Sequence, residues 1–227
     1  ADDGAAIACN FVTVWQYLAY LDWAHLRPLS VYEYEKAARG FEEPIPYAAA
    51  WGNTEFTKVD KNSIINAGTL NEGTSMTGEG LVNIGGTGSN ANPGPMRVGF
   101  AATPSSNRTQ SGGSYFGVMN LSDNLREFYH FSTEAFGTLR RDVAGDGQLA
   151  MDGQSDQAFF RVNAIYLDRG NAFEARDIFT TRERLSVSFR NLLSAELDAV
   201  GNPVPNSGGE NSPDFPKVSA GIRGGRR

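Results

Sequence analysis

Apolar residues recur at helical spacing near the start of the chain. Phe11, Val14, Leu18 and Leu21 follow one another at intervals of three or four residues. This spacing places them on one face of a helix. The pattern therefore predicts an amphipathic helix from Phe11 to Asp22.

A second helix is predicted from Val31 to Ala38. Ser30 stands three residues before Glu33, the spacing of a capping box, in which each residue bonds the backbone N–H of the other. Gly40 supplies a C-terminal stop, since glycine accepts the backbone conformation that ends helices. The same pattern turns three side chains inward: Tyr34, Ala37 and Ala38.

The rest of the chain has weaker periodicity. Residues 53–115 are rich in glycine and small polar residues, with short apolar runs at 63–65 and 98–100 that suggest short strands. A turn followed by a strand is predicted at 123–129, and residues 158–167 are rich in strand-forming residues. Leu185–Arg190 alternates apolar and polar residues, which predicts a half-buried strand.

Composition narrows the class of protein. The chain has 227 residues, of which 40% are hydrophobic and 26 are glycine, so a loop-rich globular fold is expected. The net charge of −6 and the lack of a long basic run argue against nucleic-acid binding. No apolar run is long enough to span a membrane. The one cysteine, Cys9, allows no internal disulfide and is predicted to be buried as a small apolar residue.

Four blocks of sequence resemble, in order, the formylglycine-generating enzyme (sulfatase-modifying factor) family. Leu26–Gly40 is similar to the family's arginine-led helix block, and Ala50–Asn53 to the Trp-Gly that follows it. Tyr115–Phe128 is similar to its Tyr-Gly-Leu block. The last block comprises segments in the places of Arg-Gly-Gly-Ser-Trp, the arginine-rich strand and Gly-Phe-Arg: Asp168–Asn171, Leu185–Arg190 and Ala220–Arg223.

This resemblance implies an α+β domain with a C-type-lectin-like fold and little regular structure. It covers residues 1–227 as one domain. The family's domain begins further upstream, so we expect the N-terminal portion to be supplied by another segment or by a neighbouring molecule.

The resemblance also sets a test for catalysis. Formylglycine generation requires two reactive cysteines in the arginine-rich strand, and this strand has none. The iron-dependent branch of the family requires a histidine cluster, whereas this chain has only His25 and His130. The catalytic cysteines and histidines are thus missing, although a rearranged metal site at the two histidines and a carboxylate remains an alternative.

A calcium site is implied by the same resemblance. The family's ligand positions correspond to the side chains of Asn120 and Glu127 and to backbone carbonyls at Asp123 and Leu125. Oxygen ligands on a tight turn suit calcium. A second group of carboxylates, Asp142, Asp146 and Asp152, departs from calcium-loop spacing and is interpreted as a solvated turn.

The leading hypothesis is a non-catalytic binding or structural protein. The resemblance implies a bacterial protein, secreted or at the cell surface, with a protein or glycan partner or self-assembly into an extracellular structure. Long loops on a rigid scaffold suit such a role. Two alternatives are a metal-dependent oxygenase of the formylglycine-generating or ergothioneine type, and a hypervariable lectin-like ligand-binding protein.

Overall fold

A computed structural model describes residues 6–85, 94–131, 144–157, 165–169, 185–187 and 191–193. The fold mixes helices and short strands with long loops, as the sequence predicts at this coarse level. The helices are α1 (Val14–Trp23), α2 (Val31–Arg39), α3 (Arg108–Ser111) and the 3-10 helix η1 (Lys61–Ser63). The strands are β1 (Thr57–Lys58), β2 (Ile64–Ile65), β3 (Gly73–Thr74), β4 (Leu81–Val82), β5 (Glu127–Phe131), β6 (Ile165–Arg169) and β7 (Asn191–Leu193).

Helix α1 begins three residues later than the spacing of apolar residues predicts. Thr13 is the N-cap, and its hydroxyl accepts the backbone N–H of Gln16 while the Gln16 side chain accepts the N–H of Thr13. These reciprocal bonds fix the helix start at Val14. Phe11 lies outside the helix, exposed and with a φ of 56°.

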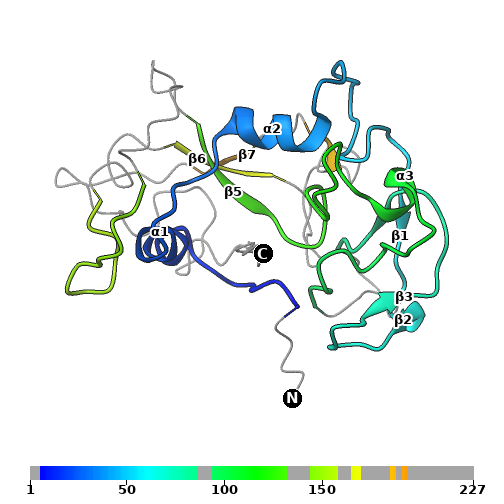
Figure 1. The fold of residues 1–227 in the computed structure, drawn as a ribbon, viewed down its shortest axis with the longest axis horizontal. Coiled ribbons are helices and arrows are strands. Elements are labelled where there is room, and N and C mark those ends of the chain that lie inside the picture. The colour runs from blue at the N-terminus through cyan, green and yellow to red at the C-terminus, as the bar shows by residue number, and fades with distance from the viewer. Residues whose placement is uncertain are drawn as a thin grey trace.

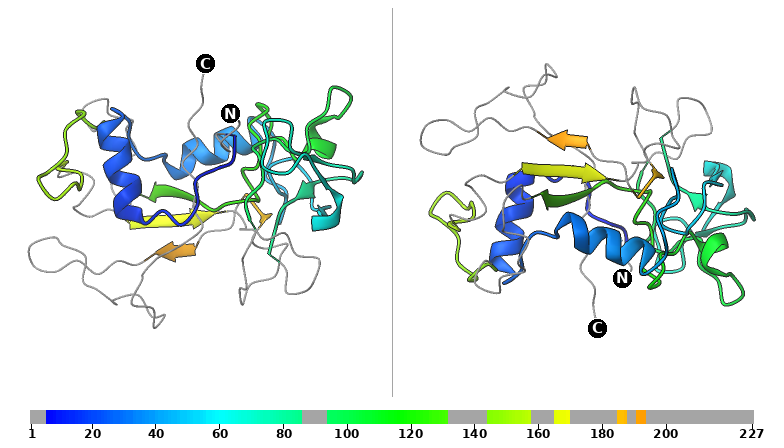
Figure 2. Two further views of the ribbon diagram at one scale, coloured as in Figure 1. Left: turned by 90° about the horizontal axis from the view of Figure 1, so that it is seen from below. Right: turned by 90° about the horizontal axis from the view of Figure 1, so that it is seen from above.

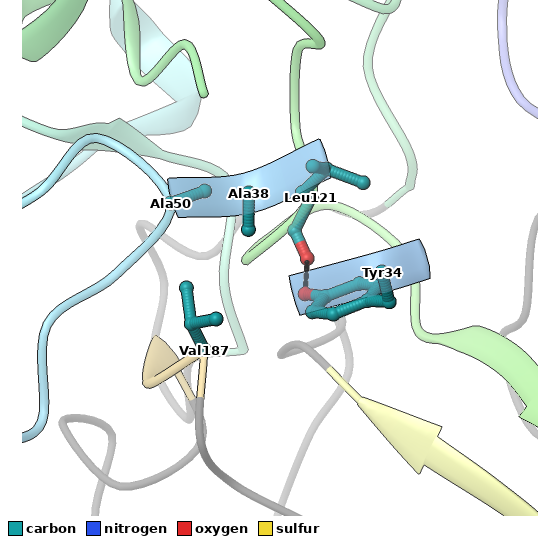
Figure 3. Close-up of a cluster of buried hydrophobic side chains, with 5 residues drawn as sticks. All are labelled: Tyr34, Ala38, Ala50, Leu121 and Val187. Carbon is teal, nitrogen blue, oxygen red and sulfur yellow. Dashed lines mark hydrogen bonds between the residues drawn. The ribbon is translucent and has the colours of Figure 1, made fainter. Parts of the chain in front are cut away.

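Helix α2 confirms the capping-box prediction and extends one residue further, to Arg39. The Ser30 hydroxyl accepts the N–H of Glu33, whose carboxylate accepts the N–H of Ser30. Tyr34 and Ala38 face the core and are fully buried, and Ala37 packs against the same cluster. The Tyr34 hydroxyl donates to the carbonyl of Leu121, which ties α2 to the segment before β5 (Figure 3).

The three longest strands form one antiparallel sheet in the order β5-β6-β7. Phe128 pairs with Asp168 between β5 and β6, and Asp168 pairs with Asn191 between β6 and β7. Figure 1 shows α1 and this sheet in one half of the molecule, with α2 running across the middle, and Figure 2 shows α2 alongside β5. The two-stranded pairs β1–β4 and β2–β3 lie in the other half, where loops dominate.

Three details differ from the sequence-based expectations. Residues 185–187 form no strand, and Leu185, Ser186 and Val187 are all buried, so the alternation there does not mark two faces. The run at 98–100 forms a turn rather than a strand. Cys9 is exposed, which contradicts the prediction of a buried thiol. Residues 158–164, 188–190 and 220–223 lie outside the described part of the chain.

In the described ranges, no helix combines the length and the apolar character that crossing a bilayer requires.

Candidate functional site

The residues predicted to bind calcium are held by hydrogen bonds within the protein. The Asn120 side-chain amide donates to Asp123 Oδ1 at 3.0 Å, and its oxygen accepts the N–H of Gly99 at 2.8 Å. Asp123 Oδ2 accepts the N–H of Asn83, and the Asp123 carbonyl accepts the N–H of Leu125. The oxygens of Asn120 and Asp123 therefore accept N–H groups of the protein.

The structure places the four predicted calcium ligands on the turn at 120–125 and at the start of β5. The structure brings Asn120 and Asp123 together at the turn, and Leu125 is buried beside it. Glu127 begins β5 and lines a cleft to which Leu121 of the turn also contributes. Calcium binding by these residues stays a prediction.

Sequence analysis missed two buried asparagines that hold this turn in place. Asn83 Nδ2 donates to Asn124 Oδ1 at 2.8 Å, and Asn124 Oδ1 also accepts the N–H of Met96. Asn124 Nδ2 returns a bond to the Met96 carbonyl. Both asparagines are about 1% exposed, so these bonds supply the partners that buried amides need. Nothing in the spacing of Asn83, Met96 and Asn124 along the chain signals their contact.

A buried aspartate organises the loop 144–157. Asp22 Oδ1 accepts the N–H of Asp146, and Asp22 Oδ2 accepts the Ser155 hydroxyl at 2.5 Å and the N–H of Asp156. A carboxylate oxygen from each of Asp22, Asp146 and Asp156 lies within 4.8 Å of the others. The N–H and O–H donors that surround Asp22 account for this arrangement as a structural anchor.

The segment with Asp142, Asp146 and Asp152, interpreted from the sequence as a solvated turn, is described from residue 144 onward. Asp146 joins Asp22, which lies far away in the sequence, whereas Asp152 caps its own turn by accepting the N–H of Gln154. Asp142 lies outside the described residues. The interpretation of this segment as a turn is compatible with these local bonds.

His25 completes the C-terminal end of α1. Its φ is 56°, its N–H donates to the Asp22 carbonyl, and the N–H of Leu26 donates to the Leu21 carbonyl. This pair of bonds is the Schellman motif, which places a left-handed residue just after the helix. The acidic cluster of Asp22, Asp146 and Asp156 does not include His25. The side chain of His130 lies outside the described part of the structure.

A cleft of about 640 Å³ lies between α1, α2 and the start of β5. The Tyr17 hydroxyl at its wall donates to the Phe128 carbonyl, and burial, with the nearby Glu127 charge in support, raises the pKa of Tyr17 to about 12. At the rim, Arg27 binds both carboxylate oxygens of Glu33, at 2.6 and 2.9 Å. That hydrogen bond is the main reason why the pKa of Glu33 falls to about 2. Tyr17, Arg27 and Glu33 thus already hold partners inside the protein.

The surface carries a contiguous group of exposed aromatic rings, here called the aromatic triad: Phe41, Tyr115 and Phe116. These residues are 75%, 41% and 54% exposed, respectively. The ring centroids lie 5.0 Å apart for Tyr115–Phe116, 6.1 Å for Phe41–Tyr115 and 6.4 Å for Phe41–Phe116. All three pairs meet edge to face, the favourable geometry for aromatic pairs.

The backbone beneath the aromatic triad is fixed by hydrogen bonds and by one glycine. The N–H of Tyr115 donates to the Ala38 carbonyl at 2.9 Å, which joins the turn at 114–118 to the end of α2. Ser114 closes that turn through both its N–H and its hydroxyl, which bond the carbonyl and the N–H of Val118. The Tyr115 ring lies over Gly40, where an added Cβ would be only 2.3 Å from the nearest ring carbon.

Charged side chains surround the aromatic triad. Lys36 places its Nζ 3.7 Å from the centre of the Phe41 ring, a cation–π contact. Arg108 binds both oxygens of Glu42 at 2.8 and 2.9 Å, and its guanidinium carbon lies 5.7 Å from the centre of the Tyr115 ring. A second Arg108 nitrogen donates to the Ala50 carbonyl, which anchors this side chain to the core.

Sequence analysis identified the segments that carry these rings but not their role. Phe41 follows the predicted helix stop, and Tyr115 and Phe116 begin the Tyr-Gly-Leu-like block. Phe41 and Tyr115 are 74 positions apart in the sequence, and an apolar residue in a sequence does not show whether it is exposed, so their contact was not predictable.

Comparison with known proteins adds no relative. No family model matches the chain, and neither the curated proteins nor the solved structures contain a significantly similar member.

Proposed function

We propose that this protein is a non-catalytic binding protein that engages its partner through the aromatic triad. The observation that carries the proposal is the exposure of three rings on a backbone that already holds them in place. Burying these rings in the core would have favoured folding, so their exposure suits a contact surface. Aromatic anchors of this kind dominate the energetics of many interfaces.

The family and the location of the protein form part of the same proposal. We assign the chain to the formylglycine-generating enzyme family, with its C-type-lectin-like fold, as a secreted or cell-surface member. Four sequence blocks in family order support this, together with the loop-rich α+β architecture. The missing cysteine pair in Leu185–Arg190 supports a binding rather than an oxidising role.

The calcium prediction rests on the resemblance alone. Purified protein is melted in calcium and in EGTA, because a ligand that binds only the folded state raises Tm. Calcium at Asn120, Asp123, Leu125 and Glu127 predicts a rise that Glu127→Gln removes. Equal melting temperatures in the two buffers reject the site without affecting the binding proposal.

A paired-variant experiment tests the proposed function. The double variant Phe41→Ala/Phe116→Ala removes two exposed rings, and Tyr32→Ala/Leu70→Ala removes two exposed side chains outside the aromatic triad as a matched control. Each protein is assayed for self-association by sedimentation at rising concentration and for binding to a glycan array. The proposal is supported if the triad variant loses self-association or glycan binding while the control variant Tyr32→Ala/Leu70→Ala keeps it.

Two results oppose it. If the triad variant and the wild type behave identically in both assays, the aromatic triad is not a binding surface. Stoichiometric copper or iron in the purified protein, with oxygen uptake on a thiol substrate, instead supports the oxygenase alternative.

A further inference from the structure

The size of the aromatic triad limits what can bind there. A whole aromatic side chain presents about 150–250 Å², so the exposures of the three residues correspond to about 250–430 Å² of accessible surface. A stable protein interface uses about 800 Å² on each partner. The rings alone are therefore too small a platform for a stable protein partner, but they match a ligand of a few stacked rings.

The arrangement of the rings favours a ligand that is itself built of rings. Because Phe41, Tyr115 and Phe116 meet edge to face, their planes differ by 75–88°, and the rings face different directions rather than forming one flat plane. A chain of pyranose sugars has apolar C–H faces that pack on aromatic faces, and its rings change orientation along the chain. Rings that face different directions suit such a chain better than one flat aromatic ligand.

The charged rim favours hydroxyl groups over a ligand of one charge. Glu42 and Arg108 neutralise each other. Lys36 adds N–H donors beside the Phe41 ring. Donors and acceptors therefore stand together around the rings, and sugar hydroxyls both donate and accept hydrogen bonds. An acidic or a basic polymer would meet repulsive as well as attractive groups on this rim.

The rings are also organised before a ligand arrives. The Tyr115 N–H bond to Ala38, the Ser114 turn and the close approach of Tyr115 to Gly40 fix the backbone. A surface held in its binding geometry loses little conformational entropy on binding. This lowers the cost of binding a small ligand with limited contact area.

From these four observations we infer that the aromatic triad binds an uncharged polysaccharide, whose pyranose rings stack on Phe41 and Phe116 while Lys36 and Glu42 bond its hydroxyls. The inference rests on the proposed function and names its partner class.

Affinity electrophoresis tests it directly. The protein is run through native gels that contain hydroxyethylcellulose, mixed-linkage β-glucan, xylan or galactomannan, and through gels that contain the acidic chains alginate or polygalacturonate. We expect retardation in at least one neutral gel. The dissociation constant should rise by about tenfold or more in Phe41→Ala/Phe116→Ala, equivalent to about 1.4 kcal/mol, while Tyr32→Ala/Leu70→Ala migrates like the wild type.

The salt dependence and the remaining outcomes complete the test. Binding to a neutral chain should change little when sodium chloride is raised, because stacking is weakly screened. If no neutral polysaccharide slows the protein in the gel, the inference is wrong. It is also wrong if only the acidic polysaccharides slow the protein and sodium chloride abolishes that effect. If the wild type self-associates, the triad variant does not, and no polysaccharide slows either protein, then the partner is a protein. That result rejects the polysaccharide as the ligand and leaves the proposed function in place.

Discussion

Replacing Gly40 by alanine tests whether the end of α2 builds the aromatic triad. Gly40 has a φ of 63° and a ψ of −119°, a region that residues with a Cβ rarely adopt. The backbone strain alone costs about 1–3 kcal/mol. The new methyl group would also lie 2.3 Å from the nearest carbon of the Tyr115 ring, well inside van der Waals contact, so the ring must move.

Displacing the Tyr115 ring lowers the free energy of unfolding further, and a control variant separates this loss from the loss due to backbone strain. An edge-to-face contact with Phe41 or Phe116 contributes about 1 kcal/mol, and the hydrogen bond from Tyr115 to Ala38 about another 1 kcal/mol. Gly68→Ala is the matched control, because Gly68 has a φ of 77° and no atom within 4 Å of an added Cβ. We therefore expect Gly40→Ala to destabilise the protein by about 2 kcal/mol more than Gly68→Ala.

Urea denaturation and thermal melting measure this difference. In a chain of this size, about 2 kcal/mol corresponds to roughly 4–8 °C in Tm. Near-ultraviolet circular dichroism should change for Gly40→Ala, since the environment of Tyr115 changes, and not for Gly68→Ala. If the two variants lose the same stability and keep the same aromatic spectrum, the reasoning that Tyr115 packs on Gly40 is wrong.

Three further predictions concern α1, α2 and the loop 144–157. Since His25 occupies the left-handed position of the Schellman motif, His25→Gly should be about 1 kcal/mol more stable than His25→Ala in urea denaturation; equal stabilities would contradict the motif. Asp22→Asn should lower the free energy of unfolding by about 3 kcal/mol, because an amide nitrogen would face N–H donors. It should also speed hydrogen exchange at residues 144–157, whereas the exposed control Asp152→Asn should not. Unchanged exchange in Asp22→Asn would refute the role of Asp22 as an anchor. The pKa of Glu33 is about 2 in the folded protein, so the stability that its ionised carboxylate adds to the fold is complete above pH 4.5 and is lost as the pH falls towards 2. The difference in unfolding free energy between wild type and Glu33→Gln should therefore shrink over that range. A constant difference would count against the pairing with Arg27.

Local rules predicted the two long helices well. The capping pair Ser30 and Glu33 and the stop at Gly40 gave α2 within one residue, because these signals act over a few neighbouring positions. The start of α1 was misplaced since the periodicity of Phe11 and Val14 outweighed Thr13, whose capping bond to Gln16 decides the boundary. Caps are thus better guides to helix ends than apolar spacing.

Long-range contacts were not predictable from local patterns. Leu185–Arg190 alternates like a strand, yet Leu185, Ser186 and Val187 are buried together, because segments on both sides cover them. Asp22 and Ser155 meet across 133 positions, and Arg108 reaches Glu42 across 66. Polar partners of this kind depend on the complete fold, which single-sequence periodicity does not encode.

The buried pair Asn83–Asn124 has a consequence for how the loop half of the molecule can change. Asn124 bonds the side-chain nitrogen of Asn83 and both the N–H and the carbonyl of Met96, so losing the Asn124 side chain removes a hydrogen-bond partner from three groups held away from water. The segments that carry Asn83, Met96 and Asn124 should therefore unfold together as one cooperative unit, and a substitution at one of these positions should be tolerated only with matching changes at the others. In a region with so little helix and sheet, two side-chain amides take over the role that backbone ladders play elsewhere.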